Sequence, residues 1–140
     1  MVIDLGVVNP ADWGPVLQEA QTLFLVSEPT ALALGMIDRQ ISSAARAGVD
    51  DSRIFVIVNR WRQNDDQAVG FFEKKHHRCV IACLPNDYRQ VTEAVQLGIP
   101  LMSSASNSLV SRYQNLAQWL EARMAAAPPL APEAVAKSTS

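Results

Sequence analysis

Polar residues follow directly after two apolar runs of this sequence, and they are the residues best placed to bind a ligand together. Asn59-Arg60 ends the run 54–58, and Pro85-Asn86-Asp87 ends the run 79–84. No acid/base pair, and no nucleophile with an adjacent base, can be assembled from these two groups. A stand-alone enzyme of unrelated chemistry is therefore the weakest interpretation, and ligand binding is the chemistry that these residue types favour.

The two apolar runs have the pattern of strands that are buried on both faces, because they are short, unbroken and rich in β-branched residues. Between them, residues 65–75 have the spacing of a helix with Val69 and Phe72 facing inward. Two strands joined by a helix form a right-handed βαβ unit with parallel strands. Ligands of open α/β sheets bind beyond the carboxyl ends of the strands, where both polar groups fall.

The rest of the chain alternates between strand and helix patterns, which predicts an α/β protein with a mostly parallel sheet flanked by helices. Further strands are expected at 1–4 and 22–26, and further helices at 13–20, 30–47, 88–98 and 108–124. The apolar stripes of the last three helices are Leu34, Ile37, Ile41 and Ala44; Tyr88, Val91 and Val95; and Leu109, Tyr113, Leu116 and Leu120. Residues 125–140 are rich in Ala and Pro, so we expect a domain over 1–124 and a disordered tail over 125–140.

Charge and hydropathy exclude several classes of function. The net charge is −2, which gives no electrostatic footprint for nucleic acid or anionic lipid. No apolar stretch is long enough to span a bilayer, and no signal segment opens the chain. We therefore expect a cytoplasmic protein. Cys79 and Cys83 lie four residues apart in one strand, too far for a disulfide, and are expected to be reduced core thiols.

An ordered set of turn motifs resembles the C-terminal half of the MinD/ParA-type P-loop ATPases. The nearest resemblance is to the CpaE/TadZ-like branch, associated with assembling and positioning type IV (Tad/Flp) pili, and it covers about residues 2 to 123. The motifs are Asp4-Leu5-Gly6, Val26-Ser27-Glu28-Pro29, Val58-Asn59-Arg60, Leu84-Pro85-Asn86-Asp87-Tyr88 and Ala94-Val95-Gln96-Leu97-Gly98-Ile99-Pro100-Leu101. The resemblance implies an ATP-binding protein with ATP and Mg²⁺ as its cofactors.

On the base side of the ATP site, the resemblance implies roles for the residues at the strand ends. Asn59 matches the asparagine that reads adenine, because its amide offers a donor and an acceptor. Arg60 adjoins it, and Pro85 and Asp87 match the loop that closes over the purine and ribose. Trp61 follows directly and is interpreted as a packing residue, with a position at the border of the purine site as the alternative.

On the phosphate side, Asp4 matches the Walker B aspartate, which holds Mg²⁺ through water. Gly6 matches the switch glycine, whose backbone amide approaches the γ-phosphate. The departure from the family is large, because no G-x-x-x-x-G-K-[ST] motif occurs in this sequence. Without that loop and its lysine, we expect no ATP hydrolysis by this chain alone. The strand that carries the loop in the family also lies beside the 22–26 strand, so the sheet should have a gap next to residues 1–4.

Simpler structural roles remain open for the same residues. Asp4 has the position of a turn cap, Asn59-Arg60 that of an ordinary polar strand exit, and Asp87 that of a helix N-cap. His76-His77-x-Cys79 lacks a second pair of ligands at zinc spacing, so a metal site there is disfavoured. Cys83 has no base beside it that would mark a nucleophile.

Two functional hypotheses follow. In the first, the chain supplies the adenine-side and Walker B residues of a CpaE-like ATPase whose site is completed elsewhere. In the second, it is a non-catalytic, degenerate ATPase relative that docks onto pilus or secretion machinery. The expected partners are pilus or secretion assembly proteins, together with a second copy of the chain or the missing N-terminal half. Neither nucleic acid nor direct membrane binding is expected, so any position at a membrane or cell pole would depend on those partners.

Overall fold

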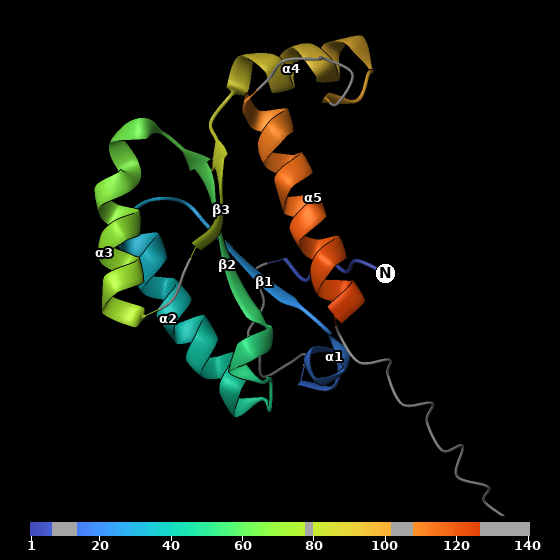
Figure 1. Ribbon diagram of the computed structural model, residues 1–140. Helices are drawn as coiled ribbons and strands as arrows, with labels where there is room; N and C mark the ends of the chain where they lie inside the picture. The colour runs from blue at the N-terminus through green and yellow to red at the C-terminus, as the bar shows by residue number, and fades with distance from the viewer. Residues whose placement is uncertain (7–13, 78–79, 102–107, 127–140) are drawn as a thin grey trace, which may run out of the picture.

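The computed structural model describes residues 1–6, 14–77, 80–101 and 108–126 of the 140-residue chain. The described strands form one parallel sheet in the order β1-β2-β3, with helices on both of its faces (Figure 1). In chain order the elements are α1 (Gly14–Glu19), β1 (Leu23–Ser27), α2 (Ala31–Arg46), η2 (Asp51–Arg53), β2 (Ile54–Trp61), η3 (Gln63–Asp65), α3 (Asp66–His76), β3 (Val80–Pro85), α4 (Tyr88–Leu97) and α5 (Ser108–Ala126).

The helices α2 and α3 cover one face of the sheet. Alternate residues of β2 point to this face, and Val56 and Val58 are completely buried there. Burial of β-branched side chains on both faces of a central strand is the main favourable term in forming such a sheet. The cluster on this face consists of Leu34, Ile37, Val56, Val58, Val69 and Phe72.

The helix α5 covers the opposite face. Ile57 of β2 packs there with Leu84 of β3 and Leu109 of α5. Further along α5, the Trp119 ring lies edge-on to Phe55, with 4.7 Å between the ring centroids. In the last turn, the Arg123 guanidinium lies 4.4 Å from the centroid of Phe55 and donates a hydrogen bond to the Ser52 carbonyl at 2.6 Å. Both ends of α5 are therefore fixed to the sheet.

A third cluster closes the amino-terminal end of the sheet. Arg53 holds α1 against this end, since its Nη1 donates to the carbonyls of Gln18 at 2.9 Å and Ala20 at 2.8 Å. The cluster consists of Leu17, Ala44, Val49 and Ile54, and Leu5, Leu23, Leu25 and Ile41 pack against it.

Most of the elements expected from the sequence are confirmed. The described helices and strands begin and end within about two residues of the expected positions, except that β2 continues to Trp61. The expected inward residues of α2 and α3 are in the core, with Ile41 partly buried. Residues 125 and 126 belong to α5, and 127–140 lie outside the described residues. Within the described part of the chain, no helix has the length and apolarity needed to cross a bilayer.

The expected strand at 1–4 is wrong. Residues 1–6 have no regular secondary structure, and Met1, Val2 and Ile3 are exposed. A strand forms only where a neighbouring strand accepts its hydrogen bonds, and no described strand flanks this segment.

The apolar stripes of the last two helices are less buried than expected. In α5, Leu109 is buried as expected, but Tyr113 is exposed. In α4, the whole stripe of Tyr88, Val91 and Val95 faces solvent, and α4 has no buried residue. The helix stands beyond the carboxyl end of the sheet (Figure 1), so its apolar side has no described element to cover it.

Candidate functional site

The carboxyl end of β2 departs from regular strand geometry where the site was expected. The register with β3 shifts between Val58 and Trp61, and Arg60 has a φ of 57°. A non-glycine residue with positive φ is strained, and such residues gather at ligand-binding and catalytic sites. The Asn59 Oδ1 accepts a hydrogen bond from the Arg60 backbone N–H at 2.9 Å, which helps to hold this turn.

The ends of β2 and β3 lie side by side, as expected. Trp61 pairs with Pro85, and the Asn86 backbone N–H donates to the Trp61 carbonyl at 2.9 Å. Asp87 then begins α4 as its N-cap, because its Oδ1 accepts the Gln90 backbone N–H at 3.2 Å. The structure therefore brings together four of the expected site residues, namely Asn59, Arg60, Pro85 and Asp87.

The end of β1 joins the same edge through an ion pair. The Arg60 Nη1 lies 2.8 Å from the Glu28 Oε1, and both side chains are more than half exposed. An exposed pair of this kind contributes at most about 1 kcal/mol to the free energy of unfolding. Its main effect is to fix the direction of the Arg60 side chain, which runs toward β1 and away from β3.

The Asn59 side chain keeps its donor available. It is half-buried, and among the described residues its Nδ2 has no hydrogen-bond partner, while Oδ1 retains a second lone pair. Because alternate residues of a strand share a face, Asn59 lies on the α5 face with Ile57. An amide in this position can recognise a planar group with an adjacent donor and acceptor.

The structure does not bring Asp4 and Gly6 to this edge. Leu5, between them, packs against the cluster at the amino-terminal end of the sheet, which contains Ile54, and Ile54 lies about 16 Å along β2 from Asn59. The Asp4 Oδ1 accepts the Gly6 backbone N–H at 2.9 Å, and Gly6 has a φ of 61°, so the segment forms a local turn. No group of three metal-binding side chains occurs among the described residues.

Two further groups have structural roles. The His76 Nδ1 lies 2.9 Å from the Asp38 Oδ1 and links α3 to α2, and the imidazole contacts the Phe72 ring in a tilted arrangement. Cys79 of the proposed His-His-x-Cys motif lies outside the described residues. Cys83 is a half-buried free thiol against the α2–α3 cluster, and its burial raises the pKa of the thiol above its ordinary value.

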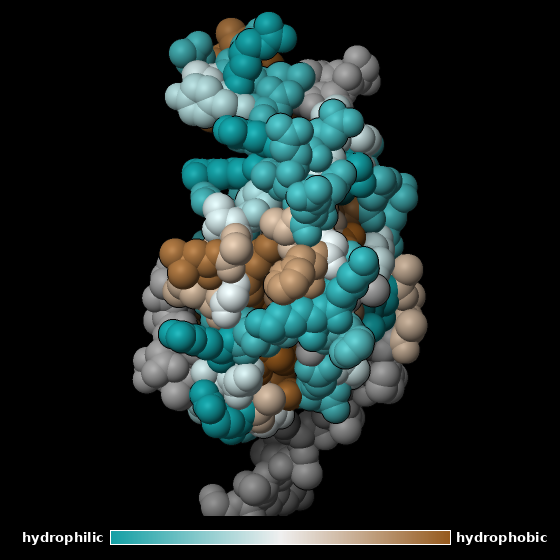
Figure 2. Space-filling model, turned by 90° about the vertical axis from the view of Figure 1, so that its left-hand side faces the viewer, coloured by the Kyte–Doolittle hydropathy of each residue, from teal (hydrophilic) through white to brown (hydrophobic). Residues whose placement is uncertain are grey.

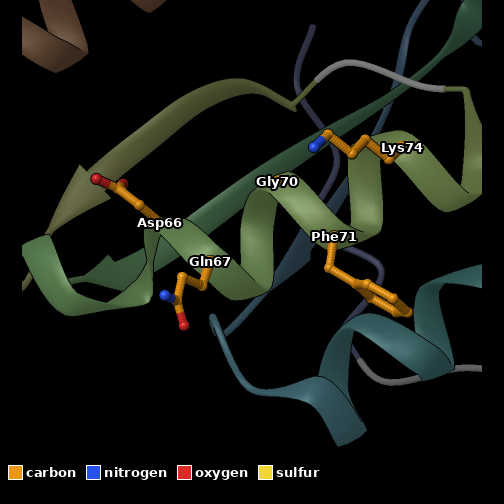
Figure 3. Close-up of a pocket in the computed structure, with 5 residues that line it drawn as sticks. All are labelled: Asp66, Gln67, Gly70, Phe71 and Lys74. Atoms are coloured by element: carbon orange, nitrogen blue, oxygen red, sulfur yellow. The ribbon is translucent and has the colours of Figure 1, made fainter.

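A hollow that sequence reasoning missed lies on the outer face of α3 and is lined by none of the expected site residues (Figure 3). It is open to solvent, has a volume of about 420 Å³, and is lined by Asp66, Gln67, Gly70, Phe71 and Lys74. The signal in the sequence was Phe71, an aromatic residue adjacent to the inward Phe72 and therefore on a different face of the helix.

Comparison with known proteins gives one informative result. No protein-family model and no curated protein sequence matches this chain. Its structure is similar to the crystal structure of a ParA family ATPase from Chlorobium tepidum TLS, with a TM-score of 0.61 and 23% sequence identity. The match covers 76% of this chain but only 43% of that ATPase. The chain therefore has the α/β fold of part of a ParA family ATPase.

Proposed function

We propose that this chain forms the base-binding side of an ATP site in a CpaE-like relative of the MinD/ParA ATPases, which acts in the assembly or positioning of type IV (Tad/Flp) pili. The fold supports the first part of this proposal, because the chain matches 43% of a ParA family ATPase. The order of the motifs at the strand ends supports the assignment to the pilus branch. The phosphate-binding half of the site is contributed by polypeptide outside this sequence.

The observation that carries the proposal is the junction of β2 and β3. The hydrogen bond from Asn86 to Trp61 holds the two strand ends together, so that Asn59 and the loop that begins at Pro85 flank one site. Parallel α/β sheets bind their ligands at this edge. The Asn59 Nδ2 would donate to a ring nitrogen of the purine, and Oδ1 would accept from the exocyclic amine.

This chain alone does not provide the ligands that the phosphates and Mg²⁺ of ATP require. A hard cation requires several oxygen ligands, and Asp4 lies in a local turn at a distance from Asn59. The sequence also lacks the loop of backbone amides and the lysine that bind phosphate. The proposal therefore assigns base recognition to this chain and no step of hydrolysis.

Calorimetric titration with Mg-ATP tests the proposal. The full chain alone should bind weakly or not at all, and adding a polypeptide that carries Lys-Gly-Gly-x-Gly-Lys-Thr should restore binding. Asn59→Ala should then weaken the restored affinity by about five- to tenfold, the effect of losing one or two hydrogen bonds. The control is Asn64→Ala, an exposed asparagine of η3, which should leave the affinity unchanged.

Two results would overturn the assignment. Turnover of Mg-ATP by the unaided chain would show that the phosphate site is complete within it. Restored binding that is unaffected by Asn59→Ala would show that the base is recognised elsewhere.

A second candidate function is a nucleotide-independent docking module for pilus or secretion proteins. It is favoured by α4, where Tyr88 is 77% exposed and Val95 is 74% exposed. Apolar residues that line one exposed side of a helix are typical of a surface that binds another protein. In a binding assay with pilus assembly proteins, Val95→Ser should abolish binding under this alternative, whereas Asn59→Ala should have no effect. The reverse pattern favours the ATP site.

A further inference from the structure

The outer face of α3 carries two charged side chains, an exposed aromatic ring and a glycine. Asp66 and Lys74 are separated by eight residues and Gly70 lies midway between them. Figure 3 shows Asp66 and Lys74 directed to one side of the helix, with Gln67 and Phe71 directed to the other. Gly70 therefore lies within the charged row, at the centre of the hollow, and next to the row that contains the aromatic ring.

The outer face of α3 is complementary to the same face of a second copy of the chain. A two-fold axis that runs between the two copies beside Gly70, perpendicular to the helices, places two copies of α3 antiparallel. Asp66 of each copy then lies opposite Lys74 of the other, so that two symmetric ion pairs form. On the other side of the crossing, the two Phe71 rings lie next to each other, an arrangement in which aromatic side chains attract.

Gly70 is suited to the crossing point. A Cβ built on it would meet no atom within 4 Å, so the backbone is open to solvent and a second helix can approach closely. The Phe71 side chain is 69% exposed, a large apolar area without cover from the described residues. Figure 2 views the molecule from this side and shows apolar side chains open to solvent among hydrophilic ones.

We propose that two copies of this chain associate through the outer faces of α3, antiparallel about Gly70. The described surface is a single helix of 11 residues, so the contact is smaller than a stable interface of about 800 Å² per partner. The dimer is therefore weak and depends on protein concentration. It requires neither nucleotide nor the residues at the strand ends.

Sedimentation analysis of the full chain over a range of concentrations tests the proposal. The chain should show a reversible monomer–dimer equilibrium. Asp66→Lys and Lys74→Glu each convert two attractive contacts into repulsive ones, so each should weaken self-association by about tenfold or more. When the two variants are mixed, opposite charges again face each other at both contacts, and a mixed dimer should form at least as readily as the unaltered one.

Variants that leave the core intact serve as controls for effects on folding. Asp66 also accepts the Trp61 indole N–H at 3.1 Å, so Asp66→Lys also perturbs the fold. Lys74→Glu and Gly70→Gln avoid this, because Lys74 has no hydrogen bond among the described residues and a Gly70 side chain has open space. Gly70→Gln should retain or raise the thermal midpoint, because glutamine has the higher helix propensity, but it should block the crossing and abolish dimers. A monomer at all concentrations, or a dimer that tolerates both of these variants, would overturn the proposal.

Discussion

The helices α3 and α4 have similar positions in the chain and similar apolar patterns, but α3 is packed against the sheet and α4 is exposed. Each follows a strand through a short turn, carries an apolar stripe and ends at a residue with positive φ, His77 or Gly98. In α3 the stripe residues Val69 and Phe72 are buried against the sheet. In α4 no residue is buried, and its apolar stripe faces solvent.

The difference shows that amphipathicity determines a helix and its apolar side but not what covers that side. The connection back into the sheet places α3 against α2 and β2, since a right-handed crossover must lie on a face of the sheet. By contrast, α4 leads from β3 into α5 beyond the carboxyl edge, where no described strand lies beneath it (Figure 1). Its apolar side therefore has no cover among the described residues, whereas that of α3 stabilises the domain.

Truncating one aromatic residue on each helix gives the largest expected contrast. Phe72→Ala should lower the free energy of unfolding by about 3 to 5 kcal/mol, because the side chain is 3% exposed and leaves a cavity. Tyr88→Ala should change it by less than about 0.5 kcal/mol. Urea unfolding followed by circular dichroism measures both values. Equal losses would mean that α4 is packed as firmly as α3.

Removing an N-cap from α4 and from a packed helix compares exposed and buried elements through a smaller expected change in stability. Asp87→Ala should destabilise α4 by about 1 kcal/mol, but it should leave the global unfolding midpoint unchanged, because α4 contributes no buried residue. The matched control is Thr30→Ala, since the Thr30 Oγ1 caps α2 by accepting the Ala33 N–H at 3.2 Å. Loss of this cap should lower global stability by about 1 kcal/mol.

Hydrogen exchange of the backbone amides distinguishes the two cap variants. Faster exchange should be confined to α4 in Asp87→Ala and should extend through the core in Thr30→Ala. A lowered global midpoint in Asp87→Ala would contradict the view of α4 as an independent unit.

Thiol reactivity gives the smallest expected effect. Burial raises the pKa of Cys83, so its alkylation at pH 8 should be several-fold slower than that of a thiol introduced by Val95→Cys on α4. Both rates are measured with Cys79→Ser in the background. The Cys83 rate should increase only as the pH rises toward the raised pKa, and any stability that depends on the neutral thiol should be lost over the same range. Equal rates at pH 8 would show that Cys83 is not shielded.

Much of the candidate site was predictable because it depends on local rules. The runs that became β2 and β3 end at Asn59 and Pro85, and parallel strands joined by one helix must present those ends at the same edge. The positive φ of Arg60 and its ion pair with Glu28 were not predictable. They arise from a register shift and from the position of β1, which no local pattern encodes.

The sequence by itself determined the alternation of strands and helices, the inward faces of α2 and α3, and the polar strand ends, because periodicity and side-chain chemistry act over a few residues. Only the tertiary structure decided that residues 1–4 form no strand, that the stripe of α4 is exposed, and that Asp4 lies apart from Asn59. Each of these outcomes depends on which neighbours are present. A strand needs a hydrogen-bonding partner, an apolar stripe needs a surface to cover it, and a binding site needs side chains brought together from distant parts of the chain.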